Sequence, residues 1–169
     1  LDNTLIIVTS DNGNPLARAK CNLYDAGTRM PLAIRLPGTI HGGRTVTDFT
    51  NLVDIAPTVL ELAGVEVPEV MSGRSLLPVL KSDKSGRVDP ARDFAVTHFE
   101  RHTWCRRGGL GYPARALRTD DFLYIRNYEP GRGPAGDPYF DSRPQGVVGD
   151  IDRSPSKTFI MEIKDDPWL

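Results

Sequence analysis

The chain lacks three features that would assign a sequence to a class directly. It contains no apolar run approaching the ~20 residues that a membrane-spanning helix needs. Its two cysteines set no disulfide framework, and they leave both one disulfide and two free thiols open. Its 21 Lys and Arg residues face 22 Asp and Glu residues, so there is no electrostatic case for nucleic acid as a partner.

The rest of the composition is that of a soluble globular chain. The residues are 39% hydrophobic and 25% charged, which is ordinary for a domain with a core of its own. The 16 glycines and 14 prolines predict many loops, which are densest after Gly108 and especially over residues 128–157.

Three blocks follow one another along the chain. Residues 1–80 alternate strand-like and helix-like patterns, which predicts an α/β arrangement. Residues 81–93 are polar and form a connector. The third block, residues 94–169, contains two segments with alternating character, 94–99 and 122–126, which we predict to be strands.

A helix is predicted in the first block. Apolar residues recur at helical spacing from Leu52 to Ala63. Asp48 or Thr50 can cap its start, and Gly64 fits its end. Pro57 lies inside the pattern, so the helix kinks or begins late, with Pro57 in its first turn.

The residues with most chemical content follow the first apolar run. Leu5–Val8 reads as a strand buried on both faces of a parallel sheet, and Asp11 and Asn12 come just after it. Ligands bind at this edge in open α/β sheets, and two hard oxygen donors suit Ca²⁺ or Mg²⁺. Taken alone, Asp11-Asn12-Gly13 is also a common turn sequence.

Two cations strengthen the reading of this segment as a site. Lys20 and Arg29 lie between the first run and a second strand-like run, residues 30–36. A lone Lys is usually a solvated surface group. A hard metal and an ammonium placed together are what a site for a doubly negative oxyanion needs.

The order of motifs resembles the C-terminal half of the sulfatases, members of the alkaline phosphatase superfamily. The resemblance covers about the first eighty residues through several ordered motifs: Thr9–Gly13, Lys20, Leu23–Leu32, Leu36–Gly38, Asn51–Leu60 and Gly73–Pro78. Within the family it is closest to the heparan N-sulfatase (sulfamidase) branch, because of Asn22–Tyr24, Gly111–Thr119 and Phe122–Asn127.

The resemblance implies a fold. It is the C-terminal part of an alkaline phosphatase-like α/β sandwich over residues 1–80, followed by a small antiparallel α+β subdomain over residues 94–169. The chain begins at Leu1 without an initiator Met or a signal-like segment. We therefore expect it to be a fragment of a longer enzyme, inactive without its other half.

The resemblance also implies a site. Asp11 and Asn12 are two ligands of Ca²⁺, with Mg²⁺ possible, and Lys20 is a catalytic residue that contacts the sulfate. The nucleophile of the family is a formylglycine, expected in the missing N-terminal half. Neither Cys21 nor Cys105 fits its motif. Relatives can carry Arg in place of Lys20, which binds sulfate as a fork rather than as a point charge.

A polar cluster at the end of a predicted strand offers groups for binding a sugar. Glu100, Arg101 and His102, with Trp104 beside them, are charged, cationic and aromatic. The resemblance places a substrate-facing His in this region, so we predict that His102, Glu100 and Arg101 bind substrate. A lone His is more often a satisfied structural residue than a ligand, and this is the interpretation we keep for His98.

The sequence thus predicts a metal-dependent sulfatase that hydrolyses sulfate esters or N-sulfates on sugars or glycosaminoglycans. Two alternatives stay open: a phosphodiesterase or phosphonate hydrolase of the same superfamily, and a non-catalytic relative that binds glycans. Zinc-dependent phosphodiesterases use imidazole ligands, and the position where they usually carry His is Asn12 here, which argues against this alternative. Family habit implies export, to a bacterial periplasm or a lysosome, and the oligomeric state is left open.

Overall fold

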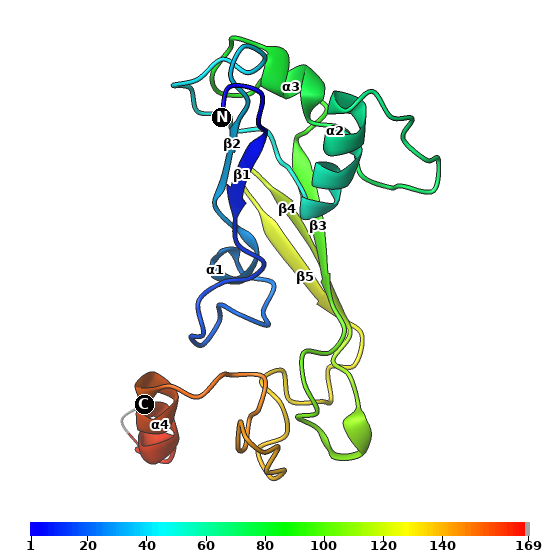
Figure 1. Cartoon of the computed structure of the whole chain (residues 1–169). Helices are drawn as coiled ribbons and strands as arrows, with labels where there is room; N and C mark the ends of the chain where they lie inside the picture. Colours follow the sequence, from blue (N-terminus) through cyan, green and yellow to red (C-terminus); the bar gives the residue numbers. More distant parts are fainter. Residues whose placement is uncertain (168–169) are drawn as a thin grey trace. The chain divides into compact units, whose positions relative to one another are not determined.

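The computed structural model describes residues 1–167 (Figure 1). The chain divides into two compact units. The first comprises residues 1–8, 32–96 and 118–122, and the second comprises residues 9–31, 97–117 and 123–169. The elements in chain order are β1 (Ile6–Thr9), α1 (Asp25–Thr28), β2 (Leu32–Arg35), η1 (Leu52–Asp54), α2 (Ile55–Leu62), α3 (Leu77–Lys81), β3 (Phe94–Phe99), η2 (Arg107–Gly109), β4 (Ala114–Thr119), β5 (Leu123–Asn127) and α4 (Pro155–Ile163).

Strands β1 and β2 form a two-stranded sheet. Both strand predictions are confirmed in position, but the setting of β1 differs from the prediction. Within the described residues β1 pairs with β2 alone, which runs in the opposite direction (Figure 1), and Val8 is 60% exposed. The predicted strand buried on both faces of a parallel sheet is therefore not what the structure shows at this position, because a two-stranded sheet has no further strands beside β1.

The predicted helix exists as α2, preceded by the short turn η1. Pro57 lies in its first turn, as predicted, because the N–H of an early helical residue has no partner inside the helix. Gly64 ends it with a φ of +69°, a conformation that glycine adopts without strain. The predicted caps Asp48 and Thr50 were both wrong, because Asn51 caps the start of η1 and Asp54 precedes α2. The carboxylate of Asp48 accepts hydrogen bonds from the backbone N–H groups of Val88 and Asp89 instead.

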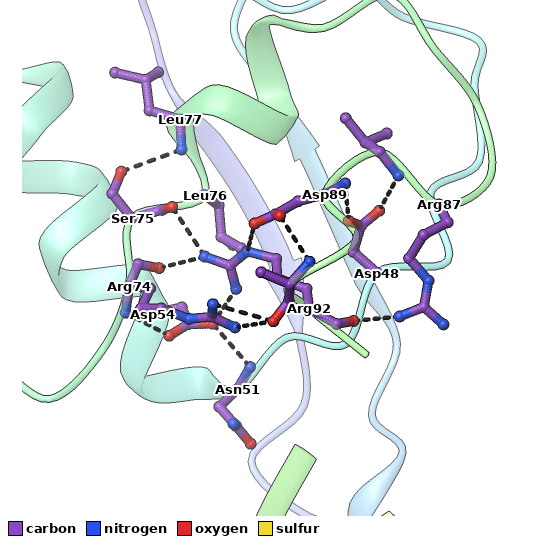
Figure 2. A network of polar contacts seen from close by, with 12 residues as sticks. Asp48, Asn51, Asp54, Arg74, Ser75, Leu76, Leu77, Arg87, Asp89 and Arg92 are labelled. Carbon is purple, nitrogen blue, oxygen red and sulfur yellow. Dashed lines mark hydrogen bonds and ion pairs between the residues drawn. The ribbon is translucent and has the colours of Figure 1, made fainter. Parts of the chain in front are cut away.

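A buried ion pair anchors the start of α2 to the connector (Figure 2). Arg92 Nη1 donates to Asp54 Oδ2 at 2.8 Å, and the two side chains are 3% and 7% exposed. Asp54 also accepts from the backbone N–H groups of Asn51 and Arg74. Arg92 Nη2 donates to the carbonyls of Arg74 and Ser75. Arg92 Nε lies 3.6 Å from Asp89 Oδ2, so every charged atom in this pair has a partner, as a buried charge requires.

Strands β3, β4 and β5 form a second sheet in that order. The short connection from β4 to β5, residues 120–122, makes this pair antiparallel. Strands β3 and β5 were predicted within one residue of their observed bounds. In the second unit the core is small: Leu23, Ala114 and Ala116 are buried, and Phe99, Leu123 and Ile125 pack against them.

The sequence did not predict strand β4 or the helices α1, α3 and α4. In the part of the chain that the structure describes, no helix is long and apolar enough to cross a membrane. The compact units are interleaved along the chain, and the predicted blocks 1–80, 81–93 and 94–169 stay a prediction.

Candidate functional site

Asp11 and Asn12 follow the end of β1 in a tight turn. Asp11 is exposed and Asn12 is half-buried. Asn12 Nδ2 donates to the carbonyl of Gly13 at 2.9 Å. This hydrogen bond does not use Oδ1, the amide atom that would ligate a cation. A Cβ at Gly13 would lie 2.0 Å from the carbonyl oxygen of Ala26, so the turn can pack only with glycine at this position.

These two residues fit part of a Ca²⁺ site. They are adjacent hard oxygen donors, which is the ligand type that Ca²⁺ and Mg²⁺ prefer. Among the described residues no group of three or more His, Cys, Asp or Glu side chains could hold a metal ion. The two donors are thus a partial ligand set, and their role as metal ligands stays a prediction.

Lys20 is held by a carboxylate far away in the sequence. The loop that carries it is closed by hydrogen bonds from the N–H groups of Leu16 and Lys20 to the carbonyl of Asn14. Lys20 Nζ lies 2.8 Å from Asp152 Oδ2, and both side chains are about a quarter exposed, at 27% and 23%. The hydrogen bond to Asp152 raises the pKa of Lys20, and the charge of Asp11 adds to this effect.

The structure brings Lys20 and His102 to one cavity. A cavity of about 430 Å³ is lined by Lys20, His102, Thr103, Pro144, Gln145, Asp152 and Arg153. Two predicted substrate-binding residues, 82 positions apart in the sequence, therefore face the same space. With Arg153 beside them, the lining is rich in groups that bind an anion, and Asp152 is the carboxylate among them.

Glu100 and Arg101 are placed differently. Glu100 forms an ion pair with Arg115. Arg101 donates to the carbonyl of Gly109 at 3.1 Å and lies over the ring of Trp104 at 5.6 Å from its centroid. Neither residue lines the cavity of Lys20 and His102. Their predicted role in substrate binding stays a prediction that this arrangement does not support.

A buried carboxylate, that of Asp150, lies next to His102, which lines the cavity. Asp150 is 1% exposed, with Arg106 Nη2 at 2.8 Å from its Oδ2 and His102 Nδ1 at 3.9 Å from its Oδ1. The thiol of Cys105 faces the same carboxylate, and burial together with Asp150 raises the pKa of Cys105 to about 12. Both Cys105 and Cys21 are free thiols in the structure.

Lys157 holds the segment that carries Asp150 through hydrogen bonds to its backbone. Its Nζ donates to the carbonyls of Gln145, Val148 and Ile151 at 2.8, 3.2 and 2.8 Å. Burial lowers the pKa of Lys157. Ser154 caps α4 by accepting from the backbone N–H of Lys157. These contacts make an irregular segment a defined support for the cavity.

Sequence reasoning missed Asp150, Asp152 and Arg153. They lie in a stretch rich in glycine and proline that predicts only loops. A signal was present beside them, because Ser154 followed by Pro155 is the pattern of a capped helix start, and Asp150 and Asp152, two positions apart, come just before it.

Known sulfatases share the sequence pattern of this chain. Residues 18–130 match the family described as N-sulphoglucosamine sulphohydrolase, C-terminal. The chain is 33% identical over 133 residues to an ulvan-active sulfatase of Formosa agariphila. It is 38% identical over 135 residues to an N-acetylglucosamine-6-O-sulfatase of Bacteroides thetaiotaomicron. The two matches cover 79% and 76% of this chain but only 20% and 23% of those relatives.

Solved structures give the same picture of the fold. BT4656, solved in complex with its substrate D-glucosamine-2-N,6-O-disulfate, matches with a TM-score of 0.63 and 34% identity. This match covers 75% of the present chain and 26% of BT4656. A second structure from Bacteroides thetaiotaomicron has a TM-score of 0.58 at 21% identity and shows likeness of fold alone. The predicted α/β fold of a sulfatase C-terminal portion is confirmed.

Proposed function

Because this chain belongs to the N-sulphoglucosamine sulphohydrolase C-terminal family of the sulfatases, we propose that it is part of an enzyme that hydrolyses sulfate esters or N-sulfates on sugars. The match spans about a fifth to a quarter of the length of the two relatives described above and of a second ulvan-active sulfatase. The observation that carries the proposal is the cavity shared by Lys20 and His102.

Lys20 supplies fixed positive charge to this cavity. An ammonium group has three N–H donors, and Asp152 takes one of them. The others are available to sulfate oxygens. Because Asp152 favours the charged form of Lys20, the ammonium is present before substrate arrives and does not need to be reorganised as negative charge develops.

His102 is remote from Lys20 in the sequence but lines the same cavity. An imidazole can donate to an anion when protonated and exchange hydrogen bonds with sugar hydroxyls when neutral. Its role in the proposal is to bind and orient the sugar next to the sulfate held by Lys20. Arg153, on the same lining, adds a second cationic group.

Asp11 and Asn12 are proposed to contribute two oxygen ligands to Ca²⁺, with Mg²⁺ as the alternative. A bound divalent cation at this position supplies charge that polarises the sulfate oxygens. The formylglycine nucleophile is proposed to come from the part of the protein outside this sequence. For the whole enzyme we also propose export, in keeping with a relative named as an extracellular sulfatase from Drosophila melanogaster.

A substrate panel tests the proposed function. The full-length enzyme is incubated with glucosamine 6-sulfate, N-sulfoglucosamine and an aryl phosphate diester, and released sulfate and phenol are measured. We expect sulfate from at least one sugar. Cleavage of the phosphate diester without sulfate release would instead indicate a phosphodiesterase, and glycan binding without any turnover would indicate a non-catalytic relative.

A further inference from the structure

The carboxylate of Asp150 is buried without a strong hydrogen-bond donor. It is 1% exposed, and among the described residues no hydrogen bond to Oδ1 or Oδ2 has acceptable geometry. Arg106 lies 2.8 Å away, yet its Nη2 donates to the carbonyls of Gly133 at 2.7 Å and Pro134 at 3.3 Å. Arg106 therefore balances the charge of Asp150 while its N–H groups point elsewhere. A buried carboxylate in this state favours any donor within reach.

His102 is the donor in reach that also faces the cavity. Its Nδ1 lies 3.9 Å from Asp150 Oδ1, about one ångström beyond a hydrogen bond. The thiol of Cys105 is the other group facing the carboxylate, and S–H is a weak donor. A rotation of the partly exposed imidazole would close the gap, whereas Arg106 would have to withdraw an N–H from a backbone carbonyl to do the same.

The consequence concerns which ring nitrogen carries the proton. A neutral imidazole has one N–H, and the hydrogen bond made by one nitrogen decides the state of the other. If Nδ1 keeps its proton for Asp150, then Nε2 is left as an acceptor on the side of the ring away from Asp150. His102 lines the cavity together with Lys20 and Asp152, so this nitrogen is the one available to a ligand there.

We propose that Asp150 is a positioning residue that holds the Nδ1 proton of His102 and so presents Nε2 to the sugar bound beside Lys20. The ligand class is a sugar with a hydroxyl group, which donates to Nε2, next to an anionic substituent on Lys20. The kinetic part of this inference rests on the proposed function, but the part concerning the tautomer of His102 does not.

The backbone of the segment supports this role. The N–H of Asp150 donates to the carbonyl of Ala135 at 3.0 Å, and that of Ile151 donates to Val148 at 3.1 Å. Lys157 fixes the same segment through three carbonyls. A carboxylate on a rigid support orients a ring more effectively than one on a mobile loop.

The first experiment measures the tautomer directly. The full-length enzyme is labelled with ¹⁵N-histidine, and the His102 resonances are assigned by their loss in His102→Gln. We expect the neutral ring to carry its proton on Nδ1 in the wild type. A neutral ring protonated on Nε2 would overturn the inference. This measurement requires neither turnover nor a folded Asp150→Asn variant, so it stands even where the proposed function fails.

The second experiment uses kinetics with a matched control. Asp150→Asn is expected to lower kcat/KM on the sulfated sugar by roughly tenfold or more, because an amide can present either its N–H or its oxygen to the ring. Combined with His102→Gln it should cost little beyond His102→Gln alone, since both act through one ring. Additive losses would contradict the inference. Asp141→Asn is the control, because Asp141 is exposed and pairs with its near neighbour Arg143.

Discussion

At the scale of single residues, the most informative contact is the ion pair of Lys20 with Asp152. It joins a residue near the start of the chain to one near its end, at 2.8 Å. The pair is partly exposed, so its net contribution to folding stability is small. Its importance is for the site, because it fixes the position of the ammonium group that lines the cavity with His102.

Replacing Lys20 tests whether its ammonium contacts the sulfate. Lys20→Ala in the full-length enzyme should raise the barrier by roughly 2–4 kcal/mol, the range for removing one preorganised stabiliser, with kcat falling and the fold intact. Lys20→Arg should recover part of the loss. Steady-state kinetics on a sulfated sugar, with thermal melts as a control for folding, make the measurement. A Lys20→Ala enzyme with wild-type kcat/KM would remove Lys20 from the site.

The thiol of Cys21 provides a pH-dependent prediction. Burial raises its pKa to about 12, from an ordinary value of 9.0. Because the folded state holds the thiol proton to higher pH, alkylation by iodoacetamide in the native enzyme should keep rising between pH 9 and 11. A denatured control should level off in that range. Mass spectrometry of the Cys21 peptide measures both rates, and coincident pH profiles would contradict the prediction.

At the residue level, the sequence offers candidates where a local motif exists and offers none where the partner is remote. Asp11, Asn12 and Lys20 sit in a stretch whose order of residue types already indicates a site. Asp152 becomes a candidate site residue only through its contact with Lys20, 132 positions away. No periodicity or spacing encodes that distance, since it is set by tertiary folding of a loop-rich segment.

At the scale of elements, the loop between β1 and β2 is shaped by close backbone approaches. A Cβ at Gly13 would lie 2.0 Å from the carbonyl oxygen of Ala26, and one at Gly27 would lie 2.2 Å from that of Ala19. These glycines let the turn that follows Asn12 pack against α1, the short helix Asp25–Thr28. The loop that presents Lys20 is thus defined by packing, although it contains little regular structure.

Substituting one of these glycines should therefore disturb the loop. Gly13→Ala should destabilise the enzyme by about 1–3 kcal/mol, the range for an overpacked site, and lower activity through displacement of Lys20. Gly42→Ala is the matched control, because a Cβ there meets no atom within 4 Å. Chemical denaturation of the two variants decides the matter. Equal stabilities would show that the loop relaxes without cost.

The anchor of α2 is the other element-scale feature with a measurable consequence. Asp54→Asn removes the closer and more buried of the two carboxylates that pair with the guanidinium of Arg92, because Asp89 Oδ2 remains 3.6 Å from its Nε. The expected loss is about 3 kcal/mol of unfolding free energy, the lower end of the range for breaking one side of a buried pair, since Asp89 still compensates part of the charge. Asp83→Asn, at an exposed position, should change stability by less than about 0.5 kcal/mol. Comparable urea midpoints for the two variants would count against a structural role for the pair.

Elements with strong periodicity were predictable, and those built from small or polar residues were not. Helix α2 carries apolar residues at helical spacing and ends at a glycine. Strand β4 buries Ala114 and Ala116, whose small side chains give a weak alternating signal. Helix α4 begins at a serine cap and a proline, but the glycines and prolines that precede it predict loops rather than a helix.

At the scale of the whole molecule, the proposed site belongs to one compact unit. Residues 9–31, 97–117 and 123–169 cluster together, and they contain Asp11, Asn12, Lys20, His102 and Asp152. The sequence blocks had separated these residues into a catalytic part and a C-terminal subdomain. The contacts show that the C-terminal part contributes directly to the cavity of Lys20.

Removal of the metal tests the proposed site in the complete enzyme. Asp11 and Asn12 are hard oxygen donors that suit Ca²⁺ and Mg²⁺ better than Zn²⁺. Activity of the full-length enzyme on a sulfated sugar should fall on treatment with a chelator, and it should return with Ca²⁺ or Mg²⁺ but not with Zn²⁺ alone. Asp11→Ala should raise the Ca²⁺ concentration needed for half-reactivation, because affinity follows the number and charge of the ligands. Asp83→Asn should leave that concentration unchanged. Full activity in the metal-stripped wild type, or an unchanged Ca²⁺ requirement in Asp11→Ala, would exclude Asp11 as a ligand of a required metal.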